Sequence, residues 1–595
     1  MNSPLPQSQP PDSVWYGWIL KLFHHWKVGE RQVTYVWAVL VGMVGSCMSL
    51  FFEWMVEVIQ WMLTGIWSDS RVGTFSLVEP EWRMFIPVAG GLVAGCILLF
   101  LKKRMPGQAT EYMEAMSIGN GLIKFRASAL KVFSAAWSIA SGAAIGKEGP
   151  IIQSSALIAS TVGQRLHVSI PRLRLLVGCG AAAGFTTAFH APFSGCLFVS
   201  EIIIGTVSMD ILAPLLIASC TGFVMLHLLG DPSPLYCSPF ESFTVFSQSL
   251  WCIALGAAAA VAARGWVSLL DAAARYLNGR QSLLPLRLAA AGLVVGILAV
   301  FYPEVVGNGQ ALITGLVHED YGTREALVLL LVKVSAVAVV FGCGTVGGAM
   351  TPTLYVGSMV GFIFSTVLTS LGMEGNHTVA YAMVGMASFF AVAAQAPLTA
   401  LVMVVEFSMS GQMIYPLLIG VVSAYGTGKL IRARSMYAAS LAGSPASVVS
   451  LPMAQVHVHD LARHVVPQVA PDASLDDVSS LMLRNPGDLV FVVNKDGTYE
   501  GAIYPEDFLA VRRQMEERKG AAPADAGSLV RTGAPVLDAG THLTDALKLF
   551  EQTHLPAFPV VWKNTGRLDG VLYRNALFQV ITEMMKRESG GDVGM

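Results

Sequence analysis

A carboxylate lies between helix-breaking residues in the stretch Gly146-Lys-Glu-Gly-Pro150, inside a long apolar region. An ionisable side chain at bilayer depth is costly to hold, and it usually marks an ion path. Pro150 suits the first turn of a helix, because the N–H group that proline lacks would be unpaired there anyway. The free N–H groups and positive dipole end of such a helix favour an anion. We therefore predict that Glu148 occupies an anion site at a helix start. The alternative is a glutamate at a helix end that faces the cytoplasm.

The composition is that of a membrane protein. Hydrophobic residues make up 54% of the 595 positions and charged residues 13%, and the mean hydropathy is +0.57. A helix of about 20 apolar residues crosses a bilayer. Apolar, charge-poor runs lie at 33–51, 85–101, 211–229, 252–263, 287–301 and 326–343. Other runs, at 150–162 and 174–189, are short and interrupted by Gly, Pro or Ser. Interrupted spans are tolerated only where protein or a polar cavity satisfies the freed backbone, which favours a transporter or channel core.

Positive residues flank several of the apolar runs, whereas the net charge of −2 says little. They are Lys21, Lys27 and Arg31, then Lys102, Lys103 and Arg104, and finally Lys429, Arg432 and Arg434. Because positive residues beside short loops favour the cytoplasmic side, we predict that both termini are cytoplasmic. The first residues lack the order of a cleavable signal, and we expect them to be retained as an interfacial segment.

An internal duplication organises the apolar part. The stretch from Gly180 to Pro192 recurs from Gly385 to Pro397, and a glutamate follows each proline by nine positions, at Glu201 and Glu406. Farther upstream, Ser141 to Pro150 matches Cys343 to Pro352 at nearly the same offset. Repeated halves of transporters often have opposite orientations and place their broken helices around one midplane site. We therefore expect two related, inverted halves.

After about residue 445 the chain becomes polar and contains nothing long enough to span a membrane. A second duplication begins there, at Ser474-Leu-Asp-Asp-Val and at His542-Leu-Thr-Asp-Ala. Each copy is predicted to form a helix, a buried strand, a turn, a second strand and a helix. We divide the chain into an interfacial segment (1–32), a membrane domain (33–440), a linker (441–452), paired α/β units (453–585) and a tail (586–595).

These residues resemble the CLC family of chloride channels and chloride/proton exchangers, and the C-terminal pair is similar to CBS domains. Gly146-Lys-Glu-Gly-Pro150 is similar to the family's gate motif, and Gly347-Gly-Ala-Met-Thr-Pro352 is similar to its second pore motif. The resemblance implies an all-α polytopic membrane core of two inverted repeats. It also implies a homodimer with one pore in each subunit, in the inner (plasma) membrane of a bacterium.

The resemblance also assigns roles in the pore. Glu148 would be the gate: ionised, it occupies an anion site, and protonated or displaced, it lets chloride through. Gly146, Lys147 and Gly149 would lie at the anion, and the amides of Ala349 and Met350 would line the central site. Tyr437 would donate its hydroxyl to the anion, with an interfacial anchor as its alternative. Lys131 would raise the positive potential of the pore, with snorkelling to the interface as its alternative.

One departure from the family pattern concerns the first pore motif, Gly-Ser-Gly-Ile-Pro. The corresponding region is Pro106-Gly-Gln-Ala-Thr-Glu-Tyr112, which puts Gln108 near the serine position. An amide donates to an anion as a hydroxyl does, and binding would survive while the preference for chloride over nitrate is left open. A helix-end glutamine that faces water is the alternative.

The other departure concerns protons. The family's exchangers usually carry an inner glutamate one position after the site of Glu201, and here that position is Ile202. Isoleucine cannot relay a proton, and neighbouring helix residues point about 100 degrees apart. The sequence therefore favours passive, channel-like chloride conduction, with proton-coupled antiport as the alternative. No span carries a voltage-sensor pattern, and any voltage response would come from the moving anion and Glu148.

The paired C-terminal units offer a weaker pattern for a cofactor. CBS pairs often bind adenine nucleotides with an aspartate shortly after a Gly-x-x-Ser/Thr turn, and Asp507 has that spacing, but Tyr504 replaces the Ser/Thr. A structural, dimerising role is the favoured interpretation, and no cofactor is required.

Other function classes fit less well. A CBS-regulated divalent cation transporter would need several converging oxygen ligands, and the apolar core offers few acids. An intramembrane enzyme would need paired catalytic groups or a zinc signature, and none is present in the sequence. The scattered cysteines include no Cys-x-x-Cys pair, and neither a disulfide framework nor a metal site is predicted. No nucleic-acid partner is expected; the partners are chloride, protons, the lipid bilayer and a second copy of the chain.

Overall fold

The computed structural model describes most of the membrane region and much of the C-terminal region. The described residues are 30–67, 71–105, 110–117, 121–166, 168, 170–205, 207–230, 235–236, 246–277, 281–318, 320–372, 377–438, 457–462, 466–484, 489–494, 496–504, 507–508, 525–530, 535–553, 555, 557–574 and 577. The chain divides into two compact units, one of residues 1–112, 122–166 and 174–436, and one of residues 113–121, 167–173 and 437–595.

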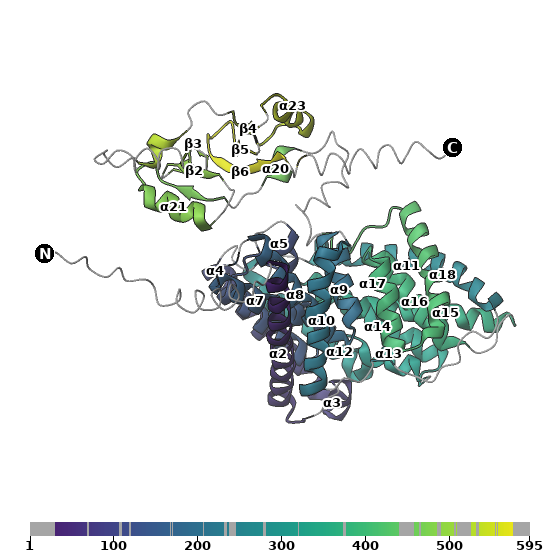
Figure 1. Ribbon diagram of the computed structural model, residues 1–595. Helices are drawn as coiled ribbons and strands as arrows, with labels where there is room; N and C mark the ends of the chain where they lie inside the picture. Colours follow the sequence, from purple (N-terminus) through teal and green to yellow (C-terminus); the bar gives the residue numbers. More distant parts are fainter. Residues whose placement is uncertain are drawn as a thin grey trace. The chain divides into compact units, whose positions relative to one another are not determined.

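Helices build the membrane region (Figure 1). Those of the first half are α2 (Glu30–Thr64), α3 (Arg71–Leu77), α4 (Pro80–Arg104), α5 (Tyr112–Ser117), α6 (Phe125–Ala140), α7 (Glu148–Arg165), α8 (Ile170–Phe189), α9 (Pro192–Phe198), the π-helix η1 (Val199–Ile204) and α10 (Met209–Leu229). Those of the second half are α11 (Phe246–Leu277), η2 (Gln281–Leu283), α12 (Leu284–Phe301), η3 (Pro303–Val305), α13 (Gln310–Val317), α14 (Thr323–Gly342), α15 (Met350–Ser370), α16 (Thr378–Ala393), α17 (Pro397–Ser408), η4 (Gly411–Met413) and α18 (Ile414–Leu430).

Within the described residues, eight helices are long and apolar enough to cross a membrane. They lie at Val33–Thr64, Pro80–Arg104, Met209–Leu229, Leu250–Leu277, Leu284–Phe301, Thr323–Gly342, Met350–Ser370 and Gly411–Leu430. Six of them cover the six apolar runs predicted above, the last of them except for its final residue, Cys343. The spans at Met350–Ser370 and Gly411–Leu430 were not among those runs, since serine, threonine and glycine dilute their apolar character.

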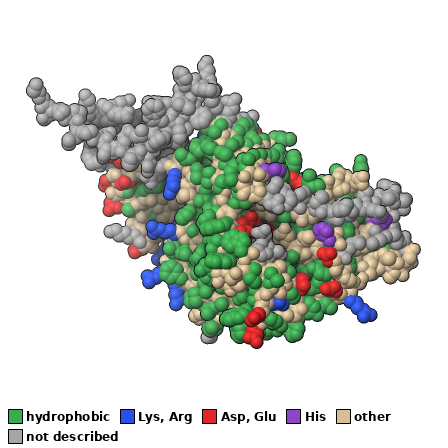
Figure 2. Space-filling model, turned by 90° about the horizontal axis from the view of Figure 1, so that it is seen from below, with side chains coloured by type: hydrophobic (Ala, Val, Ile, Leu, Met, Phe, Trp, Pro, Cys, Tyr) green, Lys and Arg blue, Asp and Glu red, His purple; other side chains and the backbone are tan. Residues whose placement is uncertain are grey.

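The surface agrees with a multi-pass membrane protein. Large apolar side chains lie exposed along the spans, including Phe51 and Trp54 on α2 and Leu286 and Ile297 on α12. In Figure 2, hydrophobic side chains form broad patches with few charged side chains among them. In water such patches would be unfavourable, but lipid tails cover them without cost.

The two copies of the predicted duplication adopt the same local structure. α6 to α9 correspond in order and type to α14 to α17. The turn before each pore loop contains a glycine with positive φ, Gly142 at 95° and Gly344 at 85°. The junctions before α9 and α17 also match, because His190 and Gln395 have φ of 56° and 59°. A non-glycine residue with positive φ is uncommon, and its recurrence at matching positions supports the predicted duplication.

Close helix packing also recurs in both halves. A Cβ atom added to Gly42 on α2 would lie 2.6 Å from the Ala218 carbonyl oxygen on α10. In the second half, a Cβ atom on Gly256 of α11 would lie 2.4 Å from the Gly420 carbonyl oxygen on α18. Glycine is thus required where these helices touch, as is common for helix pairs in membranes.

The C-terminal region forms two similar three-stranded sheets. In the first, β1 (Gln468–Val469) pairs in parallel with β2 (Val490–Val493), which pairs antiparallel with β3 (Tyr499–Ile503). In the second, β4 (Leu537–Asp538) pairs in parallel with β5 (Ala557–Val561), which pairs antiparallel with β6 (Leu568–Tyr573). The helices are α20 (Val458–Leu461), α21 (Leu475–Arg484), η6 (Ala526–Leu529) and α23 (Leu543–Thr553).

The predicted order of helix, strand, turn and strand is confirmed in each copy, but the sequence missed the strands β1 and β4. Each has only two residues, too few for an alternating pattern. The two copies share a core in which Phe491 and Ala502 of one pack with Ala557 and Val571 of the other. The final helix of each copy lies almost entirely outside the described residues.

We predict that two glycine-to-alanine substitutions on α11 differ in their effect on thermal stability. Gly256→Ala should lower the unfolding temperature in detergent, since overpacking costs about 1–3 kcal/mol. Gly265→Ala should leave that temperature unchanged or raise it, because nothing lies within 4 Å of the added Cβ atom and alanine is the better helix former. An equal loss of stability in both variants would contradict the close contact between α11 and α18.

Candidate functional site

Two loops from the two halves of the chain meet inside the membrane region. The N–H of Gly146 donates to the carbonyl oxygen of Gly348 at 2.7 Å, and the N–H of Gly348 donates to that of Gly146 at 2.9 Å. This pair is an isolated antiparallel bridge. Equivalent residues that pair antiparallel are what a two-fold relation between the halves produces, which agrees with the predicted inversion.

Each loop continues directly into a helix. α7 begins at Glu148, and α15 begins at Met350 after the N-cap residue Ala349. The first N–H groups of a helix have no partner within it, and both helix starts carry partial positive charge. The structure therefore brings the starts of two helices to one place, as the duplicated motif predicted. Met350 is buried, and the amides of Ala349 and Met350 lie at the start of α15.

Glu148 is buried at this junction, with only 2% of its surface exposed. Its Oε1 atom accepts hydrogen bonds from Asn308 Nδ2 at 2.8 Å and from Thr351 Oγ1 at 2.5 Å. Its Oε2 atom has no hydrogen-bond partner among the described residues. The structure confirms that Glu148 lies buried at a helix start, which contradicts the alternative of a glutamate exposed at a helix end. Its place in an anion site stays a prediction.

The glycines of the motif allow this close approach. A Cβ atom on Gly146 would lie 2.0 Å from Glu148 Oε2 and 2.7 Å from the Gly348 carbonyl oxygen. A Cβ atom on Gly149 would lie 3.3 Å from the Gly348 nitrogen. Any side chain at Gly146 would therefore push the two loops apart or expel the carboxylate.

Three further residues belong to the surroundings of Glu148, and the sequence patterns did not predict them. Asn308 and Thr351 donate to its carboxylate. Lys333 on α14 is 1% exposed and donates to the carbonyl oxygens of Val305 and Gly307, which belong to the segment that carries Asn308. One available signal was the lysine itself, because a charge within the apolar run 326–343 is expensive and marks function. Nothing in the local sequence pointed to Asn308 or Thr351 as partners of Glu148.

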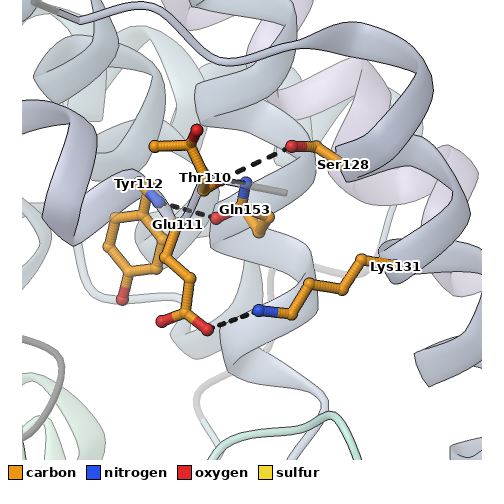
Figure 3. Close-up of polar contacts among 6 residues, drawn as sticks. All are labelled: Thr110, Glu111, Tyr112, Ser128, Lys131 and Gln153. Carbon is orange, nitrogen blue, oxygen red and sulfur yellow. Dashed lines mark hydrogen bonds and ion pairs between the residues drawn. The ribbon is translucent and has the colours of Figure 1, made fainter. Parts of the chain in front are cut away.

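The two lysines predicted to act at the pore, Lys131 and Lys147, each form an ion pair with a glutamate. Lys147 Nζ lies 2.5 Å from Glu53 Oε1 on α2. Lys131 Nζ on α6 lies 2.5 Å from Glu111 Oε1 (Figure 3). Each pair balances its own charge, which reduces the field that Lys131 or Lys147 contributes beyond it. The role of Lys131 in the pore potential stays a prediction.

Gln153 on α7 anchors the segment that replaces the family's first pore motif. Its Oε1 accepts from the Tyr112 N–H at 2.8 Å, and its Nε2 donates to the Thr110 carbonyl oxygen at 3.1 Å (Figure 3). Ser128 Oγ donates to the same carbonyl oxygen at 3.4 Å. Gln108 lies outside the described residues. The structure thus fixes the far end of this segment and leaves the assignment of Gln108 as a prediction.

Glu201 and Glu406 hold the two halves together. Glu201 accepts hydrogen bonds from the N–H groups of Leu398 and Thr399 and from the Thr399 hydroxyl, at the start of α17. Glu406 accepts hydrogen bonds from the N–H groups of Phe193 and Ser194 and from the Ser194 hydroxyl, at the start of α9. Each glutamate of the duplication therefore caps a helix of the opposite half.

The other predicted site residues lie apart from these contacts. Ile202 is buried within η1 beside Glu201. Tyr437 is half-buried in a turn and falls in the unit that contains the C-terminal region. Asp507 is half-buried just after β3, and the backbone of the following Phe508 bonds to Tyr504. The roles of Tyr437 in anion binding and of Asp507 in nucleotide binding stay predictions.

Sequence comparison matches residues 90–429 to the family model described as voltage gated chloride channel. A ClcB-like protein of Ralstonia nicotianae is 35% identical over 423 residues, which cover 70% of this chain and 98% of that protein. The Escherichia coli protein named "Voltage-gated ClC-type chloride channel ClcB" is 30% identical over 407 residues, covering 67% of this chain and 96% of that one. This chain belongs to the voltage-gated chloride channel (CLC) family. Residues 458–513 and 526–583 match the CBS domain, and the predicted C-terminal CBS pair is confirmed.

Solved structures share the fold of this CLC protein. A slow cyanobacterial Cl⁻/H⁺ antiporter aligns with a TM-score of 0.60 at 20% identity, covering 70% of this chain and 98% of that one. A eukaryotic CLC transporter aligns with a TM-score of 0.62 at 18% identity, covering 91% and 97%. The predicted fold class, a helical polytopic membrane core followed by an α/β CBS pair, is confirmed.

We predict that Gln153→Met destabilises the CLC protein, because the Tyr112 N–H loses a buried acceptor, while the Thr110 carbonyl keeps the Ser128 hydroxyl. The free energy of unfolding in detergent should fall by about 1–3 kcal/mol. Thr161→Val is the matched control on α7, since that hydroxyl donates to the Leu157 carbonyl of its own helix. Equal free energies of unfolding for the wild type and Gln153→Met would show that this anchor is dispensable.

Proposed function

We propose that this protein carries chloride across the membrane by passive, channel-like conduction, with Glu148 as the gate. The observation that carries the proposal is a buried carboxylate at the meeting point of two helix starts. Membership of a chloride channel family supports chloride as the substrate.

The gate works by competition between two anions. Ionised Glu148 holds the donors at the junction and fills the place that a chloride ion would take. Protonation removes the negative charge of the side chain and its attraction to these donors, while a high chloride concentration displaces it by mass action. Oε1 accepts two hydrogen bonds, and Oε2 accepts none from the described residues. Because only one of its two oxygens is hydrogen-bonded, the carboxylate is held less firmly than a fully bonded one.

Two residues favour conduction over exchange. Ile202 cannot bind a proton, and the neighbouring Glu201 has both carboxylate oxygens occupied at the start of α17. Proton-coupled antiport is the alternative function. It is favoured by structural relatives described as a Cl⁻/H⁺ antiporter and a fluoride/proton antiporter.

The assembly and membrane placement belong to the same proposal. The protein acts as a homodimer with one pore in each subunit, as the family resemblance implies. It lies in the inner membrane of a bacterium with both termini in the cytoplasm, which the positive residues beside its spans support. The CBS pair serves dimerisation, and an adenine nucleotide at Asp507 is its weaker, second role.

Glu148→Ala should make chloride release from liposomes less dependent on pH. The wild type should release chloride faster as the pH falls, because protonation frees the site, and alanine removes the titrating group. Chloride efflux from liposomes of purified protein, measured with a chloride electrode at several pH values, checks this. Glu53→Gln is the control variant, because it removes another carboxylate that contacts the motif through Lys147. It should keep the pH dependence of the wild type. A Glu148→Ala variant that responds to pH like the wild type would contradict the gating role.

Coupling to protons is tested by imposing a chloride gradient without a proton gradient. The voltage is clamped away from equilibrium, and the external pH is recorded. Passive conduction predicts no sustained uphill proton movement, since Ile202 breaks the relay. Sustained proton pumping driven by chloride would reject the channel and establish the antiporter.

A further inference from the structure

Lys333 is a buried lysine within a candidate membrane span that the proposed gating does not use. It lies within the span Thr323–Gly342 and is 1% exposed. Its Nζ atom donates to the carbonyl oxygens of Val305 at 2.6 Å and Gly307 at 2.7 Å. Among the described residues it forms no ion pair, in contrast to Lys131 and Lys147. A buried cation of this kind is expensive, and retaining it calls for a function.

The segment held by Lys333 carries Asn308 to the gate. Gly307 and Gly309 have positive φ of 75° and 99°, which bends the chain on both sides of Asn308. A Cβ atom on Gly309 would lie 3.3 Å from Lys333 Cε, and the segment therefore packs directly on the lysine stem. Lysine thus contacts this segment through both its charge and its methylene groups.

The amide of Asn308 has a defined direction. Its Oδ1 atom accepts a hydrogen bond from the Gln310 N–H at 3.2 Å, at the start of α13. The Nδ2 donor therefore points to Glu148 Oε1, which it reaches at 2.8 Å. Asn308 is 5% exposed and cannot exchange this partner for bulk water without a rearrangement.

Thr351 approaches the same carboxylate from the second half of the pore. It follows Met350 at the start of α15, is 1% exposed, and donates its hydroxyl to Glu148 Oε1. If the carboxylate leaves, both Asn308 Nδ2 and Thr351 Oγ1 lose a buried acceptor. An unpaired buried donor is costly, and a chloride in the vacated place would restore both bonds.

We propose that Asn308 and Thr351 are side-chain ligands that Glu148 and a permeating chloride use in turn, and that Lys333 positions them by fixing the segment 305–309. This proposal rests on the proposed gating by Glu148. The site is lined by the hydrogen-bond donors of Asn308 and Thr351, a chemistry that suits a small monovalent anion. Lys333 is a positioning residue here, because it acts through the carbonyl groups of Val305 and Gly307.

The test is chloride binding to purified full-length protein that carries Glu148→Ala, measured by isothermal titration calorimetry. In this background the Glu148 carboxylate does not compete, and a change in the chloride Kd reports on the ligands of the anion and on the residue that positions them. Adding Asn308→Ala or Thr351→Val should raise the Kd about tenfold, as expected for loss of one hydrogen bond to a charged ligand. Adding Lys333→Met should raise it similarly, and Lys333→Arg, which keeps charge and donors, should restore most of the affinity.

Thr366→Val is the matched control, because this hydroxyl on α15 donates to the Phe362 carbonyl of its own helix. Its Kd should equal that of Glu148→Ala alone. Unchanged Kd values for Asn308→Ala and Thr351→Val, at an unchanged unfolding temperature, would overturn the proposal and leave these residues as partners of the carboxylate only. If Lys333→Met does not fold, these two variants still decide whether the ligands are shared. Failure of the gate itself is recognised separately, by an unaltered pH dependence in Glu148→Ala.

Discussion

The structure depends on two buried helix starts that meet where Gly146 and Gly348 pair. Both ends carry partial positive charge and backbone donors that their own helices cannot satisfy. In a membrane interior, where water does not compensate, an acceptor must lie between them. Glu148 lies at this meeting point, where its carboxylate accepts hydrogen bonds from the side chains of Asn308 and Thr351. In the proposed gating, a free anion takes the place of this carboxylate.

The same physical device serves a static purpose elsewhere in the molecule. Glu201 and Glu406 each accept three hydrogen bonds at the start of a helix in the opposite half, and both oxygens take part. Glu148 accepts two, both on one oxygen. A carboxylate at a helix start thus forms a fixed contact when both of its oxygens accept hydrogen bonds. In the proposed gating, the less complete set of bonds at Glu148 is what would allow it to leave.

Charge is distributed unevenly among the membrane lysines. Lys131 and Lys147 lie beside acids at 2.5 Å, which confines their fields. Lys333 is fully buried and donates to two carbonyl oxygens of the segment before α13. Among the described residues it forms no ion pair, and its contacts are with carbonyl dipoles in place of a carboxylate.

The sequence by itself determined the apolar runs within six of the spans, the duplication, the paired C-terminal units and the helix start at Glu148, since these follow from hydropathy, glycine, proline and short-range spacing. Only the tertiary structure decided which side chains meet at the site. Asn308 lies 160 positions and Thr351 203 positions from Glu148 along the chain, and Glu201 reaches Thr399 across 198. Such contacts depend on how distant helices pack, because a side chain's type sets what it can bind and the fold alone sets what it reaches.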